Sequence, residues 1–138
     1  MASRMTPYLA FDGNAREAMG FYRSVFGGTL NVNTFAEFGG GDDDVPADGV
    51  MHAQLETDRD FVLMASDTPG RMDVQIGTAI TISLSGDDGE DLRRYWAALT
   101  EGGQVQMTLE KQVWGDEFGM CTDRYGIPWM VNITQAQG

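Results

Sequence analysis

Apolar and polar residues alternate along much of the chain, which is the pattern of β-strands that bury one face. The alternation predicts strands over residues 6–11, 30–38, 50–57, 61–65 and 78–85. The stretch from Trp114 to Asn132 predicts a turn, a strand, a second turn at Asp123 to Gly126, and a closing strand. Short strands are therefore expected to dominate the fold.

Two segments replace this alternation with apolar residues that recur every three or four positions, as in an amphipathic helix. They run from Ala15 to Phe26, after Asn14 as the expected N-cap, and from Glu90 to about Thr100. Each is followed by two glycines, Gly27-Gly28 and Gly102-Gly103, which commonly end helices in a left-handed conformation. One buried stripe is expected on each helix.

The order of strand, helix, Gly-Gly and three further strands occurs twice, which predicts an internal duplication. Phe21-Tyr22 aligns with Tyr95-Trp96 at an offset of 74 residues, and the two Gly-Gly pairs align at an offset of 75. The predicted fold class is α+β, with two βαβββ modules. Module 1 is placed at residues 5–68 and module 2 at residues 77–135, within a single domain over 5–135.

The charge of the chain excludes one class of partner. In 138 residues, 9 Lys and Arg stand against 21 Asp and Glu, which gives a formal net charge of -12. Nucleic acid is excluded because binding a polyanion depends on basic side chains that displace its counterions. Anionic membrane surfaces are disfavoured for the same reason.

The single cysteine, Cys121, excludes a disulfide framework and a cysteine-rich zinc site. It is expected to be a small buried thiol on a strand. The sequence contains no apolar run long enough to span a bilayer, and residues 1–4 do not begin a signal peptide. The predicted location is cytoplasmic, without a membrane partner.

Three consecutive aspartates lie in the glycine-rich stretch from Gly39 to Asp44. Their spacing lacks the alternating ligands and terminal glutamate of an EF-hand calcium loop. We therefore predict a solvated, flexible loop here. Whether it closes over a ligand is left open by the sequence.

Several short motifs are distributed over both modules. They are Pro7-Tyr8-Leu9, Gly13-Asn14-Ala15, Phe21-Tyr22, Phe26-Gly27-Gly28, Val50-Met51-His52-Ala53, Leu63-Met64-Ala65-Ser66-Asp67 and Trp114-Gly115-Asp116-Glu117-Phe118-Gly119. Together with the paired modules, they resemble the PhnB-like branch of the vicinal oxygen chelate superfamily, which includes glyoxalases, bleomycin-binding proteins and extradiol dioxygenases. The resemblance covers nearly the whole chain from Pro7 to Asn132.

This resemblance implies two four-stranded sheets, each curled into a cup with its helix on the convex side, and a homodimer. In the metal-using members, His, Gln or Glu ligands lie on the first and fourth strands of each module. The matching positions here fall near Thr6, Met64, Ala79 and Met130, and none is a histidine or a carboxylate. We therefore predict no metal site and no cofactor.

The alternation separates residues that face the helices from residues that line the cups. The predicted ligand-binding residues are Tyr8, His52, Gln54, Met64, Trp114, Asp116, Met130 and Asn132. His52 is the only imidazole, and the spacing identifies no carboxylate that orients it, so no catalytic residue is assigned. For Asp116, the favoured role is to cap the turn at Trp114.

Five methionines are candidates for an adaptable apolar pocket, because thioether chains repack around varied ligands. They are Met51, Met64, Met107, Met120 and Met130. Filling of the core is the alternative, and it explains Met51 equally well.

The predicted function is a small-molecule-binding protein of the PhnB-like branch, with no assigned reaction. The alternative is a divergent metal-dependent enzyme that uses His52 with Asp116 or Glu117 and holds a divalent metal. A third reading is a dimeric scaffold whose cups are filled by its own side chains. Members of this branch are often labelled as ubiquinone-pathway methyltransferases, but a common methyltransferase sheet requires alternating strands and helices, and only two helices are predicted here.

Overall fold

The structure is a computed structural model, which describes residues 3–38, 48–67, 77 and 79–135. The predicted loop from Gly39 to Asp44 lies outside the described residues. The chain divides into two compact units, residues 1–75 and 76–138. Each unit contains one four-stranded sheet.

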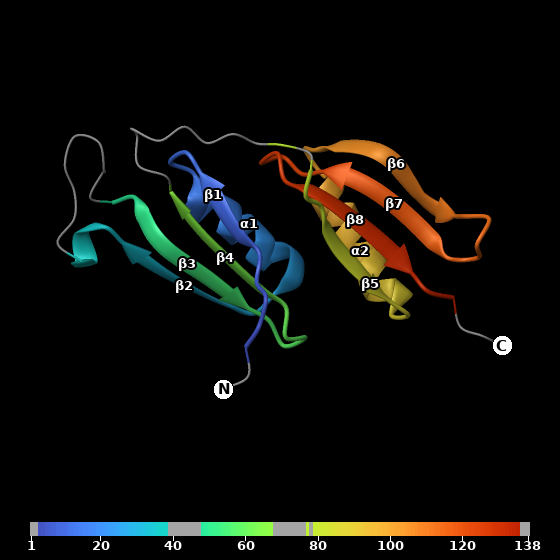
Figure 1. The fold of residues 1–138 in the computed structure, drawn as a ribbon, viewed down its shortest axis with the longest axis horizontal. Helices are drawn as coiled ribbons and strands as arrows, with labels where there is room; N and C mark the ends of the chain where they lie inside the picture. The colour runs from blue at the N-terminus through green and yellow to red at the C-terminus, as the bar shows by residue number, and fades with distance from the viewer. Residues whose placement is uncertain (1–2, 39–47, 68–76, 78, 136–138) are drawn as a thin grey trace. The chain divides into compact units, whose positions relative to one another are not determined.

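The first unit is a mixed sheet covered on one face by a helix. Its elements are β1 (Tyr8–Phe11), α1 (Ala15–Phe26), β2 (Thr29–Thr34), the short 3-10 helix η1 (Ala36–Phe38), β3 (Val50–Glu56) and β4 (Val62–Asp67). The strand order is β1-β4-β3-β2, with β1 parallel to β4 and the other pairs antiparallel. Helix α1 packs across β2, β3 and β4 (Figure 1).

The second unit repeats this arrangement. Its elements are β5 (Ile82–Gly86), α2 (Gly89–Thr100), β6 (Gln104–Lys111), β7 (Glu117–Thr122) and β8 (Pro128–Ile133). The order β5-β8-β7-β6 again has one parallel pair, β5 with β8. The predicted α+β fold with two βαβββ modules is confirmed.

Each core lies between a helix and the face of the sheet that the helix covers, as burial of alternate strand residues requires. In the first unit it consists of Phe11, Ala15, Ala18, Met19, Tyr22, Val25, Val50, Ala53, Leu55, Leu63 and Ala65. In the second unit it consists of Leu84, Leu92, Tyr95, Leu99, Cys121, Trp129, Val131 and Ile133. The predicted burial of Cys121 is confirmed.

The beginning of α1 differs from the prediction. Asn14 occupies the N-cap position, but its side chain makes no capping hydrogen bond. Instead, the buried carboxylate of Asp67 accepts hydrogen bonds from the backbone N–H groups of Ala15 and Val50, each over 2.9 Å. A negative charge at a helix N-terminus is favourable. Asp67 therefore joins the end of β4 to the beginnings of α1 and β3.

Two predicted strands are too long. The strand expected over 30–38 ends at Thr34 and is followed by η1. The Glu37 carboxylate accepts hydrogen bonds from the Thr34 backbone and the Asn33 side chain, over 3.2 and 3.1 Å. This local bond takes the place of a strand ladder. The strand expected from residue 78 begins only at Ile82.

The two Gly-Gly pairs have the same role in both units. Gly27, directly after α1, and Gly102, which follows the C-cap Glu101 of α2, adopt positive φ angles of 75° and 78°. At Gly28 and Gly103, a Cβ would overlap a backbone carbonyl oxygen of the neighbouring strand end, that of Glu56 or of Thr122. A positive φ favours glycine at the first position of each pair, and the close approach of the strand end requires it at the second. Among the described residues, no helix is long and apolar enough to cross a membrane.

Candidate functional site

The face of the first sheet opposite α1 carries four of the predicted binding residues. In the strand register, Tyr8 lies beside Met64, and Met64 lies beside Gln54. Directly paired residues of neighbouring strands point to the same face of a sheet. Tyr8, Met64 and Gln54 therefore form a row across β1, β4 and β3, on the face that α1 leaves open.

His52 joins this row through Tyr8. The Tyr8 hydroxyl and His52 Nδ1 are 3.2 Å apart, and the two rings lie 5.8 Å apart at 41°. The hydroxyl donates this bond when the imidazole carries its proton on Nε2. His52 then presents an N–H donor at Nε2. Tyr8 is exposed over 53% of its surface, so the pair is accessible to a ligand.

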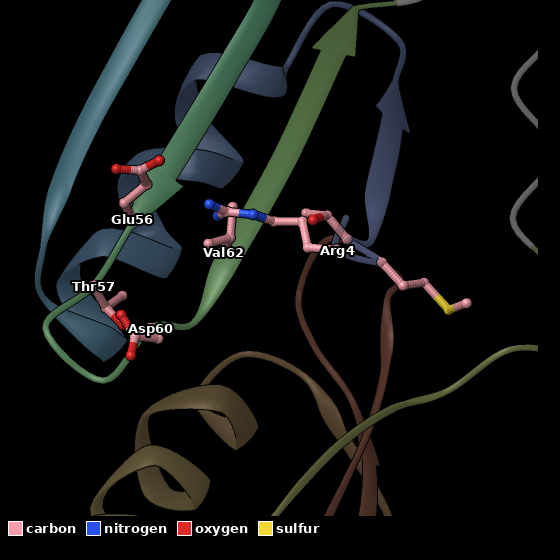
Figure 2. Close-up of a pocket in the computed structure, with 7 residues that line it drawn as sticks. Arg4, Glu56, Thr57, Asp60 and Val62 are labelled. Carbon is pink, nitrogen blue, oxygen red and sulfur yellow. The ribbon is translucent and has the colours of Figure 1, made fainter. Parts of the chain in front are cut away.

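A pocket of about 310 Å³ lies at one end of this open face. Its lining residues are Arg4, Met5, Thr6, Glu56, Thr57, Asp60 and Val62. Figure 2 shows the Arg4 side chain extending across β4 above Val62, with Glu56 and Asp60 farther along the pocket. The Gln54 amide donates a 2.5 Å hydrogen bond to Glu56, which connects the row to the pocket.

The sequence analysis missed this pocket, except for Thr6, which it considered only as a metal-ligand position. Alternation places Glu56 on the face of His52 and Gln54, and this was the available signal. The approach of Arg4 and Thr6 to the turn between β3 and β4 depends on the pairing of β1 with β4. That long-range pairing is not readable from a periodicity.

The open face of the second sheet carries methionines. Met130 on β8 pairs with Met120 on β7, and Met120 pairs with Met107 on β6. Ser83 on β5 completes the row beside Met130. Three of the five methionines proposed for an apolar pocket are thus adjacent. Met64 belongs to the open face of the first unit.

The remaining predicted residues gather near the turn between β6 and β7. Asn132 donates a 3.1 Å hydrogen bond to the Asp116 carboxylate, whose own backbone carbonyl accepts from Gln112 over 2.8 Å. The Asp116 carboxylate therefore bonds to β8 rather than to the backbone of the turn at Trp114, where the sequence predicted it as a cap. Trp114 is 59% exposed and packs edge-to-face against Phe118, with ring centroids 6.0 Å apart.

The metal-dependent alternative has no support in the described part of the chain. No group of three or more His, Cys, Asp or Glu side chains in these residues is placed to hold a metal ion. Glu117, one of its proposed carboxylates, forms an ion pair with Arg93 of α2. Ala79, a counted ligand position, is exposed and lies outside the sheet.

Cys121 is not arranged as a nucleophile. Its side chain is 1% exposed, and burial together with the nearby Asp123 carboxylate raises the pKa of the thiol to about 11. Reactive cysteines require a thiolate. The thiol is therefore protonated at neutral pH.

Residues 3–132 match the model of the family described as 3-demethylubiquinone-9 3-methyltransferase. The chain belongs to this family. The predicted resemblance to PhnB-like proteins is confirmed by this family match.

Solved structures share the fold of this family member. Protein PA1353 of Pseudomonas aeruginosa is 40% identical, with a TM-score of 0.86, and the match covers 98% of this chain and 100% of that one. A putative 3-demethylubiquinone-9 3-methyltransferase, PhnB protein, from Bacillus cereus is 22% identical, with a TM-score of 0.77 over 96% and 100%. A glyoxalase/bleomycin resistance protein/dioxygenase family enzyme from Burkholderia phytofirmans is 12% identical, with a TM-score of 0.60 over 91% and 95%.

The family description names a methyl transfer, whereas the sheets here have a different construction. Doubly wound sheets, the common methyltransferase type, alternate parallel strands with helices on both faces. Each four-stranded sheet of this family member has one parallel pair and one helix. The specific reaction of this chain is unassigned.

Proposed function

We propose that this protein binds a small polar organic molecule on the open face of its first sheet and in the adjoining pocket. The observation that carries the proposal is the Tyr8–His52 hydrogen bond beside the Tyr8–Met64–Gln54 row. A few convergent polar groups around an apolar contact are typical of ligand sites. Here Met64 supplies the apolar contact, and Tyr8, His52 and Gln54 supply the polar groups.

The volume and the charges of the pocket indicate the chemical class of the ligand. Its volume of about 310 Å³ is at the lower end of the range for small-molecule sites, roughly 300–1,000 Å³. Arg4 offers a cation, while Glu56 and Asp60 offer carboxylates. A compact ligand that carries both an anionic group and an amine would satisfy both signs of charge.

Ligand screening by native mass spectrometry tests this proposal. We expect compounds of this class to bind, and their affinity to fall at least 10-fold in Tyr8→Phe, which removes a hydroxyl donor, and in Arg4→Gln, which removes the cationic charge. Arg16→Gln is the matched control, because Arg16 is exposed on α1 and its substitution causes the same change of charge. Ligands that bind the wild type, Tyr8→Phe and Arg4→Gln equally would overturn the proposal.

The second sheet extends the same proposal. Trp114, Asp116, Met130 and Asn132 remain candidate ligand contacts, with Asp116 acting mainly through Asn132. We also propose a cytoplasmic location, a homodimer, and a single domain formed by residues 5–68 and 77–135. The support is the superfamily resemblance. Light scattering measures the dimer mass, and one cooperative unfolding transition would support a single domain.

A further inference from the structure

The methionine row of the second sheet, Met107, Met120 and Met130, brings three thioether side chains together from three successive strands. Each member is directly paired with the next. Directly opposed residues on one face have Cβ atoms about 4.5–5.5 Å apart. Methionine has three rotatable side-chain bonds, so neighbouring sulfur atoms can turn toward a common point.

A bulge in β6 is what adds Met107 to the row. Val105 pairs with the buried Cys121, while Met107 pairs with Met120, the neighbour of Cys121 on β7. Two steps along β6 thus match one step along β7. In a regular strand, Val105 and Met107 would point to the same face, toward α2. The extra residue, Gln106, shifts Met107 to the open face, as bulges re-aim side chains near functional sites. Gln106 is held on that face by the Thr122 hydroxyl, over 3.2 Å.

We propose that the methionine row is a binding site for a soft monovalent metal ion, Cu(I). Thioether sulfur is a soft ligand that selects Cu(I) over harder ions. The formal net charge of -12 also favours the approach of a cation.

Cys121 is the competing soft ligand, and its placement argues against it. It lies on β7 and pairs with Trp129 and Val105, so it is on the face covered by α2. Only 1% of the residue is exposed.

Silver(I), a redox-inert probe for Cu(I), tests the site on the untagged, full-length protein. Native mass spectrometry is expected to show one ion per chain. In protein labelled with [13C]methyl-methionine, three methyl signals should move together and saturate at one equivalent. Cu(I) itself is then measured under anaerobic conditions by competition with a chromogenic chelator.

Three variants identify the ligands. Met120→Leu keeps the volume and apolar character of the side chain but removes the central sulfur, so the affinity for silver(I) should fall at least 10-fold. Met5→Leu is the matched control, because Met5 is fully exposed and lies in the first unit. Cys121→Ala should retain the bound ion.

Two results would contradict the Cu(I) site. Binding that survives Met120→Leu but is lost in Cys121→Ala would assign the ion to the thiol and overturn the proposal. Stepwise adducts that never saturate, with shifts spread over all nine methionines, would show adventitious binding only. Neither result bears on the ligand site of the first sheet, which contains none of these three methionines.

Discussion

The turn between β3 and β4 and the turn between β7 and β8 share a hydrogen-bond pattern but not their residues. In the first turn, the Thr57 N–H donates to the Phe61 carbonyl over 3.0 Å, and the Asp60 N–H donates to Thr57 over 3.1 Å. In the second turn, the Asp123 N–H donates to the Ile127 carbonyl and the Gly126 N–H donates to the Asp123 carbonyl, over 2.9 Å each. Both are three-residue hairpin loops that end in a left-handed residue.

The residue that opens each turn shows how the two copies have diverged. The Thr57 hydroxyl accepts from two backbone N–H groups within its turn, over 3.3 and 3.1 Å. One Asp123 oxygen does the same, over 2.8 and 3.1 Å. The other Asp123 oxygen accepts from the Trp129 indole over 2.8 Å. A turn residue in the second unit therefore also fixes the core, which its counterpart does not.

This difference predicts unequal costs of removing the two side chains. Asp123→Ala deletes bonds to the backbone and leaves the buried Trp129 N–H unpaired, which should lower the free energy of unfolding by about 3 kcal/mol. Thr57→Ala deletes only local bonds near the surface, and should cost about 1 kcal/mol. Urea unfolding of the two variants measures both values.

A double-mutant cycle isolates the extra bond. In a Trp129→Phe background, the cost of Asp123→Ala should fall by about 1–2 kcal/mol, because the indole donor is already absent. Equal costs for Asp123→Ala and Thr57→Ala would contradict the core-fixing role. So would a cycle with no coupling between Asp123 and Trp129.

The residue two positions before each turn is buried in both units. It is Leu55 in the first unit and Cys121 in the second. Only the thiol can ionise. Its pKa is raised by burial and by Asp123 from 9.0 to about 11. The unfolded chain therefore loses this proton first as the pH rises. The stabilising contribution is complete below pH 9 and is lost as the pH rises through 11.

We therefore expect the stability difference between wild type and Cys121→Ala to shrink by about 2 kcal/mol between pH 8 and pH 11. Urea unfolding of both proteins across this range measures it. Leu55→Ala is the control, since its cost should not vary with pH in this way. A constant difference for Cys121→Ala would show that the thiol ionises equally well in the folded protein.

Periodicity predicted the helices and, away from the bulges, which side of a strand a residue faces, because these follow from the geometry of single elements. Tyr8, Gln54 and Met64 were accordingly placed on the correct face. The turn at Asp123 to Gly126 was also predicted, since Asp and Gly are the residues that such a turn favours.

Other features depend on contacts between distant residues, which no periodicity records. The end of β2 is fixed by the Glu37 carboxylate, and the beginning of α1 by Asp67. The bulge at Gln106 moves Met107 to the face opposite the one that simple alternation gives. The pocket around Arg4 follows from the pairing of β1 with β4.

The residue that closes each turn gives the smallest predicted effect. Asp60 has a φ of 63°, and Gly126 has a φ of 87° at the corresponding position. This left-handed conformation disfavours residues with a Cβ and suits glycine. Asp60→Gly should raise the free energy of unfolding by about 0.5–1 kcal/mol, and Gly126→Asp should lower it by about 1 kcal/mol. The shift of the urea midpoint at constant slope measures both.

Opposite signs for the two changes would show that the same backbone position is relaxed in one unit and strained in the other. The same sign for both would contradict the comparison. Asp60 also lines the pocket of the first unit, whereas no corresponding pocket role is assigned to Gly126. Strained residues persist where function requires them. The Asp60→Gly variant should therefore bind the proposed ligand more weakly, although it is more stable. Asparagine also tolerates the left-handed conformation. The Asp60→Asn variant therefore separates the loss of charge from the change of backbone.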